Sequence, residues 1–384
     1  MAQNTADVTV IGAGTIGAAI AWRCAQRGAA VTLVDPEPQR GAWNTAAGML
    51  APITELHYTE TPLLRLGLDS LARYPAFAAE VTKESDLPVG FVESGAVLAA
   101  FDGADLATLQ RLRAFAAGLG VRADLLTGQD LRELEPALAP GLPGAMYAPG
   151  DHQVDPRLLH AALLTACRQR GVQIVESAGA VLTDQGRVRG VRVAGGHVLA
   201  SRYVVVAAGT WSAQVDGMPA EVVPPVRPVK GQTLRLRLPG RPRLSRVVRG
   251  LVKGTPVYLV PRADGRIVVG ASSEEQGFDV APRAGAVYEL LRDAQSLMPE
   301  IGEAVLEEIS TGLRPGSPDN APIIGPTAVH GLVHATGHYR NGILLTPVTA
   351  DAVADLLSTG ALPEALAPFS PARFTDLSSA SGPR

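Results

Sequence analysis

Cysteine and aromatic residues are scarce in this sequence of 384 residues, which holds two cysteines and 4% aromatic side chains. Cys24 and Cys167 both stand in segments with a helical pattern, so we expect two free thiols rather than a disulfide. There is no C-x-x-C or C-x4-C pair and no G-x-S-x-G turn, and the His, Cys, Asp and Glu residues show no metal-ligand spacing. These absences exclude redox-active disulfide chemistry and a serine-hydrolase elbow, and they predict no metal site.

Neither charge sign dominates the chain, because 34 Lys and Arg residues stand against 37 Asp and Glu residues for a net charge of −3. Without a basic stripe interleaved with aromatic residues, we expect no nucleic-acid partner. The uncharged run 8–22 is shorter than the about 20 residues that a membrane-spanning helix needs. No Lys or Arg precedes this run, in contrast to the basic start of a signal peptide. We therefore expect a cytoplasmic protein without a membrane span.

Residues 7–35 carry the pattern of a nucleotide-binding unit. A β-branched strand leads into a glycine-rich turn, a helix and a second strand that ends at Asp35. Gly12, Gly14 and Gly17 have the spacing G-x-G-x-x-G, in which the first glycine permits the turn, the second lets a pyrophosphate approach and the third lets helix and strand pack closely. The helix N-terminus offers N–H groups to phosphates, and Asp35 stands where an acid binds ribose hydroxyls. The motif alone leaves FAD, NAD and a methyltransferase ligand open.

Two patterns alternate along the rest of the chain and predict an α/β fold with two discontinuous domains. Residues 155–207 combine an amphipathic helix with short buried strands, and they end in the turn Ala208-Gly209, which suits close backbone approach to a ligand. Residues 226–271 alternate as antiparallel strands do, with a hairpin that turns at 263–265. We also expect a hairpin at 89–101 and helices near 104–119 and 128–135.

D-amino-acid-oxidase-like flavoproteins, and most of all the bacterial glycine oxidases, contain segments similar to three stretches of this chain: GAWNTAAGMLAP (41–52), GLRPGSPDNAPIIG (312–325) and ATGHYRNGILLTPVTA (335–350). The resemblance extends from residue 7 to about residue 358. It agrees with the absence of a second G-x-G-x-x-G motif, because an enzyme whose substrate supplies the electrons needs no nicotinamide-binding domain.

This resemblance implies a Rossmann-type, glutathione-reductase-like domain that binds FAD and a substrate domain built on an antiparallel sheet. We expect the FAD-binding domain in residues 1–82, 145–222 and 310–365, and the substrate-binding domain in residues 83–144 and 223–309. The polar end of the chain predicts a disordered tail over residues 366–384.

The same resemblance implies FAD bound without a covalent link, and the C-terminal half of the chain indeed holds no cysteine. Residues 46–49 would line the flavin ring, and Val181 would contact the adenosine end through its backbone. The loop 340–343 leads into a final helix, with Thr346 and Pro347 as its cap and first turn, and its N–H groups would face negative charge on the reduced flavin. The residues expected to bind FAD are Gly12, Ala13, Gly14, Thr15, Ile16, Gly17, Asp35, Thr45, Ala46, Ala47, Gly48, Met49, Val181, Ala208, Gly209, Trp211, His338, Arg340, Asn341, Gly342 and Ile343.

Arg314 is the residue that the resemblance assigns to the substrate carboxylate. Its planar guanidinium can give two parallel hydrogen bonds to a carboxylate and thereby orient the α C–H bond. The alternatives are an arginine that caps the Pro-Gly turn or pairs with Asp319. Tyr258 is assigned to the same carboxylate, with a packed sheet tyrosine as the alternative, and Arg340 to the active-site mouth, with a solvated loop arginine as the alternative. Met49 completes the expected substrate contacts.

The resemblance implies oxidative deamination of glycine and of small amines or D-amino acids such as sarcosine, D-Ala and D-Pro. Hydride transfer to flavin N5 would give an imine, O2 would accept the electrons as H2O2, and the imine from glycine would serve thiamine thiazole synthesis. Pro256 and Ser273 stand where glycine oxidases carry a histidine and a methionine, which leaves the preferred substrate open. A dehydrogenase that passes electrons to a quinone or partner, and a non-catalytic flavin-binding subunit, are the alternatives. We expect a homodimer or homotetramer.

Overall fold

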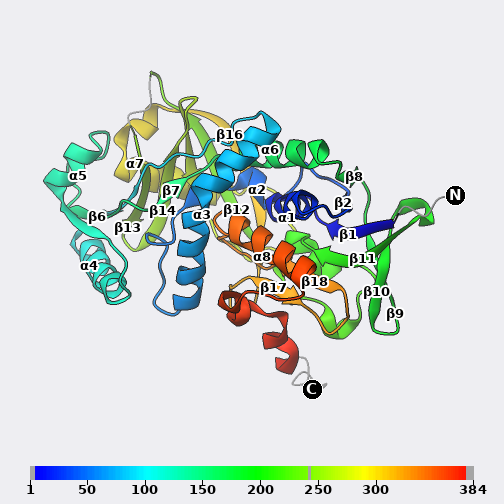
Figure 1. Ribbon diagram of the computed structural model, residues 1–384. Coiled ribbons are helices and arrows are strands. Elements are labelled where there is room, and N and C mark those ends of the chain that lie inside the picture. The colour runs from blue at the N-terminus through cyan, green and yellow to red at the C-terminus, as the bar shows by residue number, and fades with distance from the viewer. Residues whose placement is uncertain (1–4, 241–243, 378–384) are drawn as a thin grey trace, which may run out of the picture.

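The computed structural model describes residues 5–240 and 244–377, which form two large sheets flanked by helices (Figure 1). Each sheet contains eight strands within these residues, and a small sheet of β3 (Met49–Leu50) and β7 (His152–Gln153) accompanies them. Segments of the two sheets alternate along the chain, and we propose that each sheet is the centre of one domain. In the same residues, no helix is both long enough and apolar enough to cross a membrane.

The first sheet is mainly parallel and has β1 at its centre. Val8 of β1 pairs with Tyr203 on one side and with Val31 on the other. Helices cover such a sheet on both faces, which explains why its strands are continuous apolar runs rather than alternating ones. In spatial order its strands are β17 (Ile323–Pro326), β18 (Leu332–Thr336), β11 (Val198–Val206), β1 (Thr5–Ile11), β2 (Val31–Val34) and β8 (Gln173–Val175), with β10 (Arg187–Arg192) and β9 (Ala180–Asp184) continuing from β11.

Helix α1 follows β1 and packs against α6 and α8. Its residues Ala18, Ala19 and Ala21 are fully buried, because small side chains let neighbouring helices and strands approach closely. The two cysteines lie in α1 and α6, where both are free and buried. The helices around this sheet are α1 (Thr15–Gln26), α2 (Ala42–Thr45), α3 (Thr61–Ser85), α6 (Pro156–Gln169) and α8 (Thr346–Thr359).

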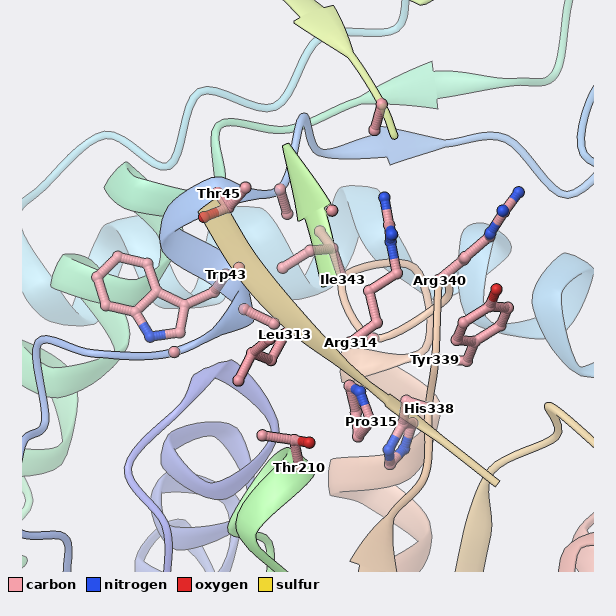
Figure 2. A pocket seen from close by; sticks show the side chains of 18 of the residues that line it. Trp43, Thr45, Thr210, Leu313, Arg314, Pro315, His338, Tyr339, Arg340 and Ile343 are labelled. Carbon is pink, nitrogen blue, oxygen red and sulfur yellow. The ribbon is translucent and has the colours of Figure 1, made fainter. Parts of the chain in front are cut away.

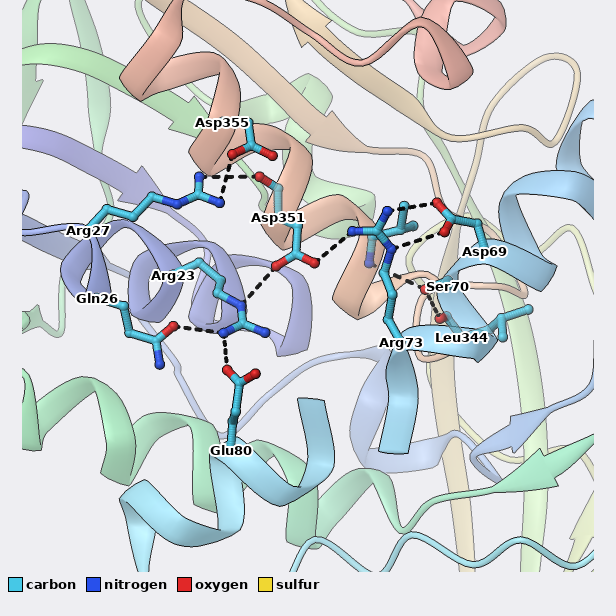
Figure 3. Close-up of polar contacts among 11 residues, drawn as sticks. Arg23, Gln26, Arg27, Asp69, Ser70, Arg73, Glu80, Leu344, Asp351 and Asp355 are labelled. Carbon is cyan, nitrogen blue, oxygen red and sulfur yellow. Dashed lines mark hydrogen bonds and ion pairs between the residues drawn. The ribbon is translucent and has the colours of Figure 1, made fainter. Parts of the chain in front are cut away.

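Charged side chains join α1, α3 and α8 near the surface (Figure 3). Asp351 of α8 forms an ion pair with Arg23 of α1 and accepts a hydrogen bond from Arg73 of α3, each at 2.9 Å. Ion pairs at exposed positions stabilise a fold by only about 0.2–1 kcal/mol each. Apolar contacts therefore carry most of the packing, for example the edge of Trp22 against Phe77, whose ring centres are 5.7 Å apart.

The second sheet is mainly antiparallel and forms the predicted hairpin, in which Tyr258 pairs with Gly270 and Pro261 with Ile267. In spatial order its strands are β16 (Val305–Gly316), β12 (Arg227–Arg237), β15 (Arg266–Gly270), β14 (Thr255–Pro261), β13 (Val247–Val252), β4 (Ala96–Ala100), β6 (Gly144–Ala148) and β5 (Asp124–Thr127). The helices beside it are α4 (Gly103–Gly118), α5 (Gly128–Leu134) and α7 (Ala284–Leu297), of which α4 and α5 were predicted within one residue or two.

Three predictions from the sequence differ from the structure. The hairpin expected at 89–101 is wrong, because residues 96–100 form the single strand β4, which pairs with β13 and β6 instead. Residues 145–148 and 310–316, which were assigned to the FAD-binding domain, belong to β6 and β16 of the second sheet. Neighbouring strands far away in sequence decide these assignments, and the local pattern does not reveal them.

The third difference concerns the predicted disordered tail. Residues up to 377 form two 3-10 helices, Glu364–Phe369 and Pro371–Leu377. Leu366 and Phe369 are buried at 1% and 2% exposure in the core around α1 and α8. Arg373 adds an ion pair with Asp319 at 2.8 Å. The tail is thus a packed segment as far as residue 377, and residues 378–384 lie outside the described part.

We predict that Phe369→Ala lowers the free energy of unfolding by about 3 kcal/mol, because a fully buried aromatic side chain leaves a cavity. Urea unfolding followed by fluorescence measures this. Phe374→Ala, at a half-buried position of the same tail, is the matched control and should cost less than half as much. Equal and small losses in both variants would contradict a docked tail.

Candidate active site

A cavity of about 710 Å³ lies where the two sheets meet, and residues of both sheets line it. Its volume is within the range of about 300–1,000 Å³ that is usual for small-molecule and cofactor sites. The glycine-rich turn after β1 forms one part of the wall. Strands β14 and β16 and the loop before α8 form another.

Different geometric constraints explain why each of the three positions in the turn is a glycine. Gly12 has φ +107°, and a Cβ there would lie 2.4 Å from the Ala207 carbonyl oxygen. A Cβ at Gly17 would lie 1.8 Å from the Gly12 carbonyl oxygen. A Cβ at Gly14 would meet only Trp43, at 3.8 Å, so this residue faces open space in the cavity. Gly14 is also the N-cap of α1 without a side-chain cap, which leaves N–H groups of the helix start for a ligand.

Asp35 follows β2 and lines the cavity beside this turn. Its two carboxylate oxygens accept hydrogen bonds from the backbone N–H of Ala13 at 2.7 Å and of Glu37 at 2.8 Å. Burial raises the pKa of Asp35, and these two backbone donors oppose the rise. The carboxylate is therefore held in a fixed orientation and can still accept hydrogen bonds from hydroxyl groups of a ligand.

Residues 44–48, here named the cavity loop, comprise the end of α2 and its link to β3, and residues 45–48 of this loop line the cavity. Gly48 has φ +73°, and a Cβ there would lie 2.0 Å from the Val154 carbonyl oxygen. Within the described residues, the Nε1 of Trp43 and the Oγ1 of Thr210 are buried on this wall without a hydrogen-bond partner. Because a buried unpaired polar group costs about 1–3 kcal/mol, both atoms point to a polar ligand.

Arg314 lies on β16 and reaches the cavity through a gap that a glycine provides. A Cβ at Gly231 of the neighbouring strand β12 would lie 2.4 Å from both terminal nitrogens of Arg314. The guanidinium donates to the carbonyl oxygens of Ser272 at 3.1 Å and Lys230 at 3.3 Å. In the described part of the chain Arg314 has no ion-pair partner, and burial lowers its pKa. The alternative partner Asp319 is instead paired with Arg373.

Tyr258 lies on β14 and packs over another strand glycine. A Cβ at Gly270 would lie 2.3 Å from the Tyr258 hydroxyl oxygen, so this contact requires glycine. Burial raises the pKa of the Tyr258 hydroxyl, against the opposing charge of Arg314. The hydroxyl is therefore protonated at neutral pH and can donate a hydrogen bond beside Arg314.

The loop before α8 supplies the last part of the wall. Figure 2 shows the guanidinium groups of Arg314 and Arg340 extending in the same direction into the cavity region, from β16 and from this loop. Arg340 is exposed and lies over the ring of Tyr339, at 5.3 Å. His338 is buried, contacts the Thr349 hydroxyl at 3.1 Å, and its pKa is lowered by burial to about 3. His338 is therefore neutral at pH 7.

The start of α8 differs from the predicted cap. The N-cap is Leu345, without a side-chain cap, and Thr346 is the first helical residue and donates from its hydroxyl to the Gly342 carbonyl at 2.8 Å. Side chains of α3 hold the preceding carbonyls from behind: Ser70 donates to Leu344 at 2.6 Å, and Tyr74 donates to Ile343. The N–H groups of this first turn are already paired within the protein: Thr346 donates to the Ile343 carbonyl and Val348 to the Ser70 hydroxyl, each at 3.3 Å, and Pro347 has no N–H.

Most residues that the sequence assigned to FAD line the cavity, although their contacts with FAD stay predictions: Gly12, Gly14, Thr15, Ile16, Asp35, Thr45, Ala46, Ala47, Gly48, Met49, Ala208, Gly209, Trp211, His338, Arg340, Gly342 and Ile343. Arg314 and Tyr258 line it as well. Ala13, Gly17, Val181 and Asn341 do not. The N–H of Val181 donates to the Asp216 carbonyl at 2.8 Å, and the predicted backbone contact of Val181 with FAD stays a prediction.

Sequence reasoning missed Arg249 and Glu55, which also line the cavity. Arg249 lies opposite Tyr258 in the β13–β14 pair and approaches Glu55 at 3.4 Å. No local motif marks these two residues, since they meet only in the folded chain. The sequence could have marked Gly231 and Gly270, because an isolated glycine inside a strand often indicates that another group packs closely against the backbone there.

The cavity wall fits the expected cofactor. The N-terminus of α1 would hold the pyrophosphate, Asp35 the ribose hydroxyls, and the cavity loop the flavin ring. The unpaired Trp43 and Thr210 groups on the same wall are available to polar atoms of the cofactor. Within the described residues, no group of three His, Cys, Asp or Glu side chains could hold a metal ion.

Comparisons with known proteins agree with this geometry. Glycine oxidase from Geobacillus kaustophilus is 37% identical over 375 residues, which cover 95% of this chain and 96% of that protein. A crystal structure of glycine oxidase from the same organism superposes with a TM-score of 0.88 over 96% of this chain and 98% of that one, at 36% identity.

Two further relatives differ in organisation. The bifunctional protein ThiO/ThiG of Synechocystis sp. is 34% identical over 377 residues, and this chain, matched over 97% of its length, spans 54% of that protein. The hydrogen cyanide synthase subunit HcnC of Pseudomonas aeruginosa is 30% identical over 409 residues, which cover 97% of each chain. The family model described as FAD dependent oxidoreductase matches residues 7–356. This chain therefore belongs to the DAO family of FAD-dependent oxidoreductases.

Proposed function

We propose that this FAD-dependent amino-acid oxidase deaminates glycine and small amines or D-amino acids such as sarcosine, D-Ala and D-Pro. The observation that carries the proposal is Arg314, a guanidinium aimed into the cavity without an ion pair in the described residues. A partly buried cation without a counter-charge is costly, and a substrate carboxylate would supply that charge. The similarity to glycine oxidases supports an α-amino acid as the source of this carboxylate.

Each side chain of the site has a role in this proposal. Arg314 binds the carboxylate at two points, and the protonated Tyr258 hydroxyl adds a third contact, which together fix the α-carbon. Arg340 stands at the exposed side of the cavity. When bound, FAD would supply the acceptor for the hydride of the α-carbon, and O2 would take up the two electrons with two protons as H2O2. The resulting imine hydrolyses to the oxo acid and ammonia or an amine.

The width of the site supports substrates beyond glycine. Pro256 and Ser273 both line the cavity, and both are exposed at its opening. A histidine or methionine at these positions would fill more of this space. The similarity to ThiO/ThiG supports a role in supplying the imine for thiamine thiazole synthesis. We propose a homo-oligomer, as the resemblance to glycine oxidases implies.

A second candidate rests on the similarity to HcnC, which is named a subunit of a synthase. In that case the chain would be a flavin-dependent dehydrogenase, or a flavin-binding subunit, that passes electrons to a quinone or partner instead of O2. The reoxidation of the reduced protein in air separates the two. Rapid return of the flavin bands with release of H2O2 supports the oxidase, and slow return supports the dehydrogenase.

We predict that glycine bleaches the flavin bands of the purified protein without air and that Arg314→Ala raises KM about a hundredfold, because a charge-assisted bidentate contact is lost. Stopped-flow spectroscopy at varied glycine measures both. Arg189→Ala, on the exposed hairpin β9–β10, is the control and should leave KM unchanged. An unchanged KM in Arg314→Ala would mean that Arg314 only supports its turn.

We predict that kcat/KM for glycine rises with pH as the substrate amine loses its proton, with no inflection from His338 or Tyr258 near pH 6–7. The pKa of His338 is lowered to about 3 by burial and that of Tyr258 is raised, so neither group changes charge in this window. Replacing glycine by sarcosine should move the inflection with the pKa of the amine. An inflection near neutrality that disappears in His338→Asn would contradict this assignment.

We predict opposite consequences of alanine at two glycines of the turn. Gly14→Ala places a methyl group in the open cavity, so the protein should keep its thermal midpoint but bind FAD about tenfold more weakly. Gly17→Ala drives a methyl group into the Gly12 carbonyl and should destabilise the fold itself by several kcal/mol, on the order of 3. Flavin content and thermal melting of both variants test this, and equal behaviour of the two would refute the distinction.

A further inference from the structure

Three arginines that lie outside the cavity donate hydrogen bonds to backbone carbonyl oxygens of the cavity loop. Arg157 of α6 and Arg235 of β12 both donate to the carbonyl oxygen of Asn44, at 2.9 and 3.0 Å. Arg262, directly after β14, donates to the carbonyl oxygen of Ala47. None of the three lines the large cavity; they border a separate cleft of about 20 Å³. They are therefore not placed to touch a substrate.

The direction of these bonds decides where the N–H groups of the loop point. In a trans peptide the C=O of one residue and the N–H of the next point in opposite directions. Because Arg262 holds the Ala47 carbonyl outside the cavity, the N–H of Gly48 is turned towards it. The Gly48 carbonyl accepts from the Val154 N–H at 2.9 Å, which turns the N–H of Met49 in the same way. Two consecutive N–H donors thus face the space that the flavin ring would occupy.

The ion pairs of these arginines leave a net positive charge on the side of the loop that faces away from the cavity. Arg157 pairs with Glu308 at 2.6 Å, Arg235 lies 3.5 Å from the same carboxylate, and Arg262 lies 3.5 Å from Asp155. Three guanidinium groups therefore share two carboxylates. Burial lowers the pKa of Arg235 to about 10, so this group still carries its charge at neutral pH.

One more ion pair borders the same cleft, and it does not change the excess of one positive charge. Arg266 lines the cleft together with the three arginines, but its charge is compensated by its own contact with Asp264.

We propose that Arg157, Arg235 and Arg262, here named the arginine clamp, position the cavity loop so that the N–H groups of Gly48 and Met49 meet the flavin, which strengthens FAD binding and makes the flavin a better electron acceptor. N–H donors that already point to the place where negative charge develops on the flavin need no reorganisation when it is reduced. The positive charge of the arginines on the other side of the loop adds to this stabilisation. The clamp residues are positioning residues, because they act through the loop. The inference rests on FAD as the cofactor of the family and is independent of the amino-acid substrate.

The test compares two arginines at opposite ends of the β14–β15 turn. Arg262→Met removes the donor to Ala47, whereas Arg266→Met removes an arginine of the same cleft that contacts Asp264 instead. The holoenzyme variants are diluted to measure FAD release by flavin fluorescence, and titrated with sulfite, which adds reversibly to electron-poor flavins and bleaches their visible bands. We expect Arg262→Met to raise both dissociation constants about tenfold and Arg266→Met to change neither.

Further variants separate positioning from general loss of stability. Arg262→Lys should recover part of the sulfite affinity, because lysine keeps the charge and one donor. Arg235→Met serves as the second test if Arg262→Met does not fold. Wild-type FAD and sulfite affinities in a folded Arg262→Met or Arg235→Met protein would overturn the proposal. So would a loss of affinity in Arg262→Met that lysine does not rescue at all.

Neither readout requires an amino acid. A protein with the expected FAD and sulfite values that glycine fails to reduce would leave the clamp intact and overturn only the proposed substrate. The reverse result, reduction by glycine with identical sulfite affinities in wild type and Arg262→Met, would overturn only the clamp.

Discussion

The site depends on one steric constraint, the close approach of three backbone segments at the end of β1. The Gly12 turn touches the end of β11 at Ala207, and the start of α1 touches the turn at Gly17, at separations that no side chain tolerates. This approach brings the N-terminus of α1 to the same edge of the sheet as Asp35. The dipole of the helix, its free N–H groups and the carboxylate then face one ligand together. Without the glycines the strands and the helix would separate, and the proposed phosphate and ribose contacts would be lost.

A second constraint acts on the rest of the cavity wall. Side chains on the side away from the cavity bind backbone carbonyl groups, so that the N–H group of the next residue can face the ligand. Arg262 does this for the cavity loop by a charged donor. Before α8, the neutral Ser70 and Tyr74 hold the carbonyls of Leu344 and Ile343, and Ser70 also accepts from the Val348 N–H. In both places a second element of the fold fixes the orientation of the backbone, and at the cavity loop this makes a preformed set of donors.

Three arginines line the cavity away from the glycine-rich turn: Arg314, Arg249 and Arg340. Among them, only Arg249 has an ion pair in the described residues, with Glu55. Placing Arg314 there requires Gly231, just as placing Tyr258 requires Gly270. Desolvation of an uncompensated guanidinium lowers stability, so the arrangement makes physical sense when an anion binds. In the proposed function, the N–H donors of the wall serve the cofactor and Arg314 serves the substrate carboxylate.

The sequence by itself determined whatever depends on local geometry. The spacing of Gly12, Gly14 and Gly17, the acid at Asp35 and the hairpin before Gly270 were all predictable, because turn sterics and strand alternation act within a few residues. The family resemblance added Arg314 and Tyr258. Only the tertiary structure decided which distant groups meet: the pairing of β4 with β13, the docking of Phe369, the approach of Arg249 to Glu55, and the grip of Arg262 on Ala47. These contacts join residues far apart in the chain, and their energy comes from burial and charge in the folded state, which no local pattern encodes.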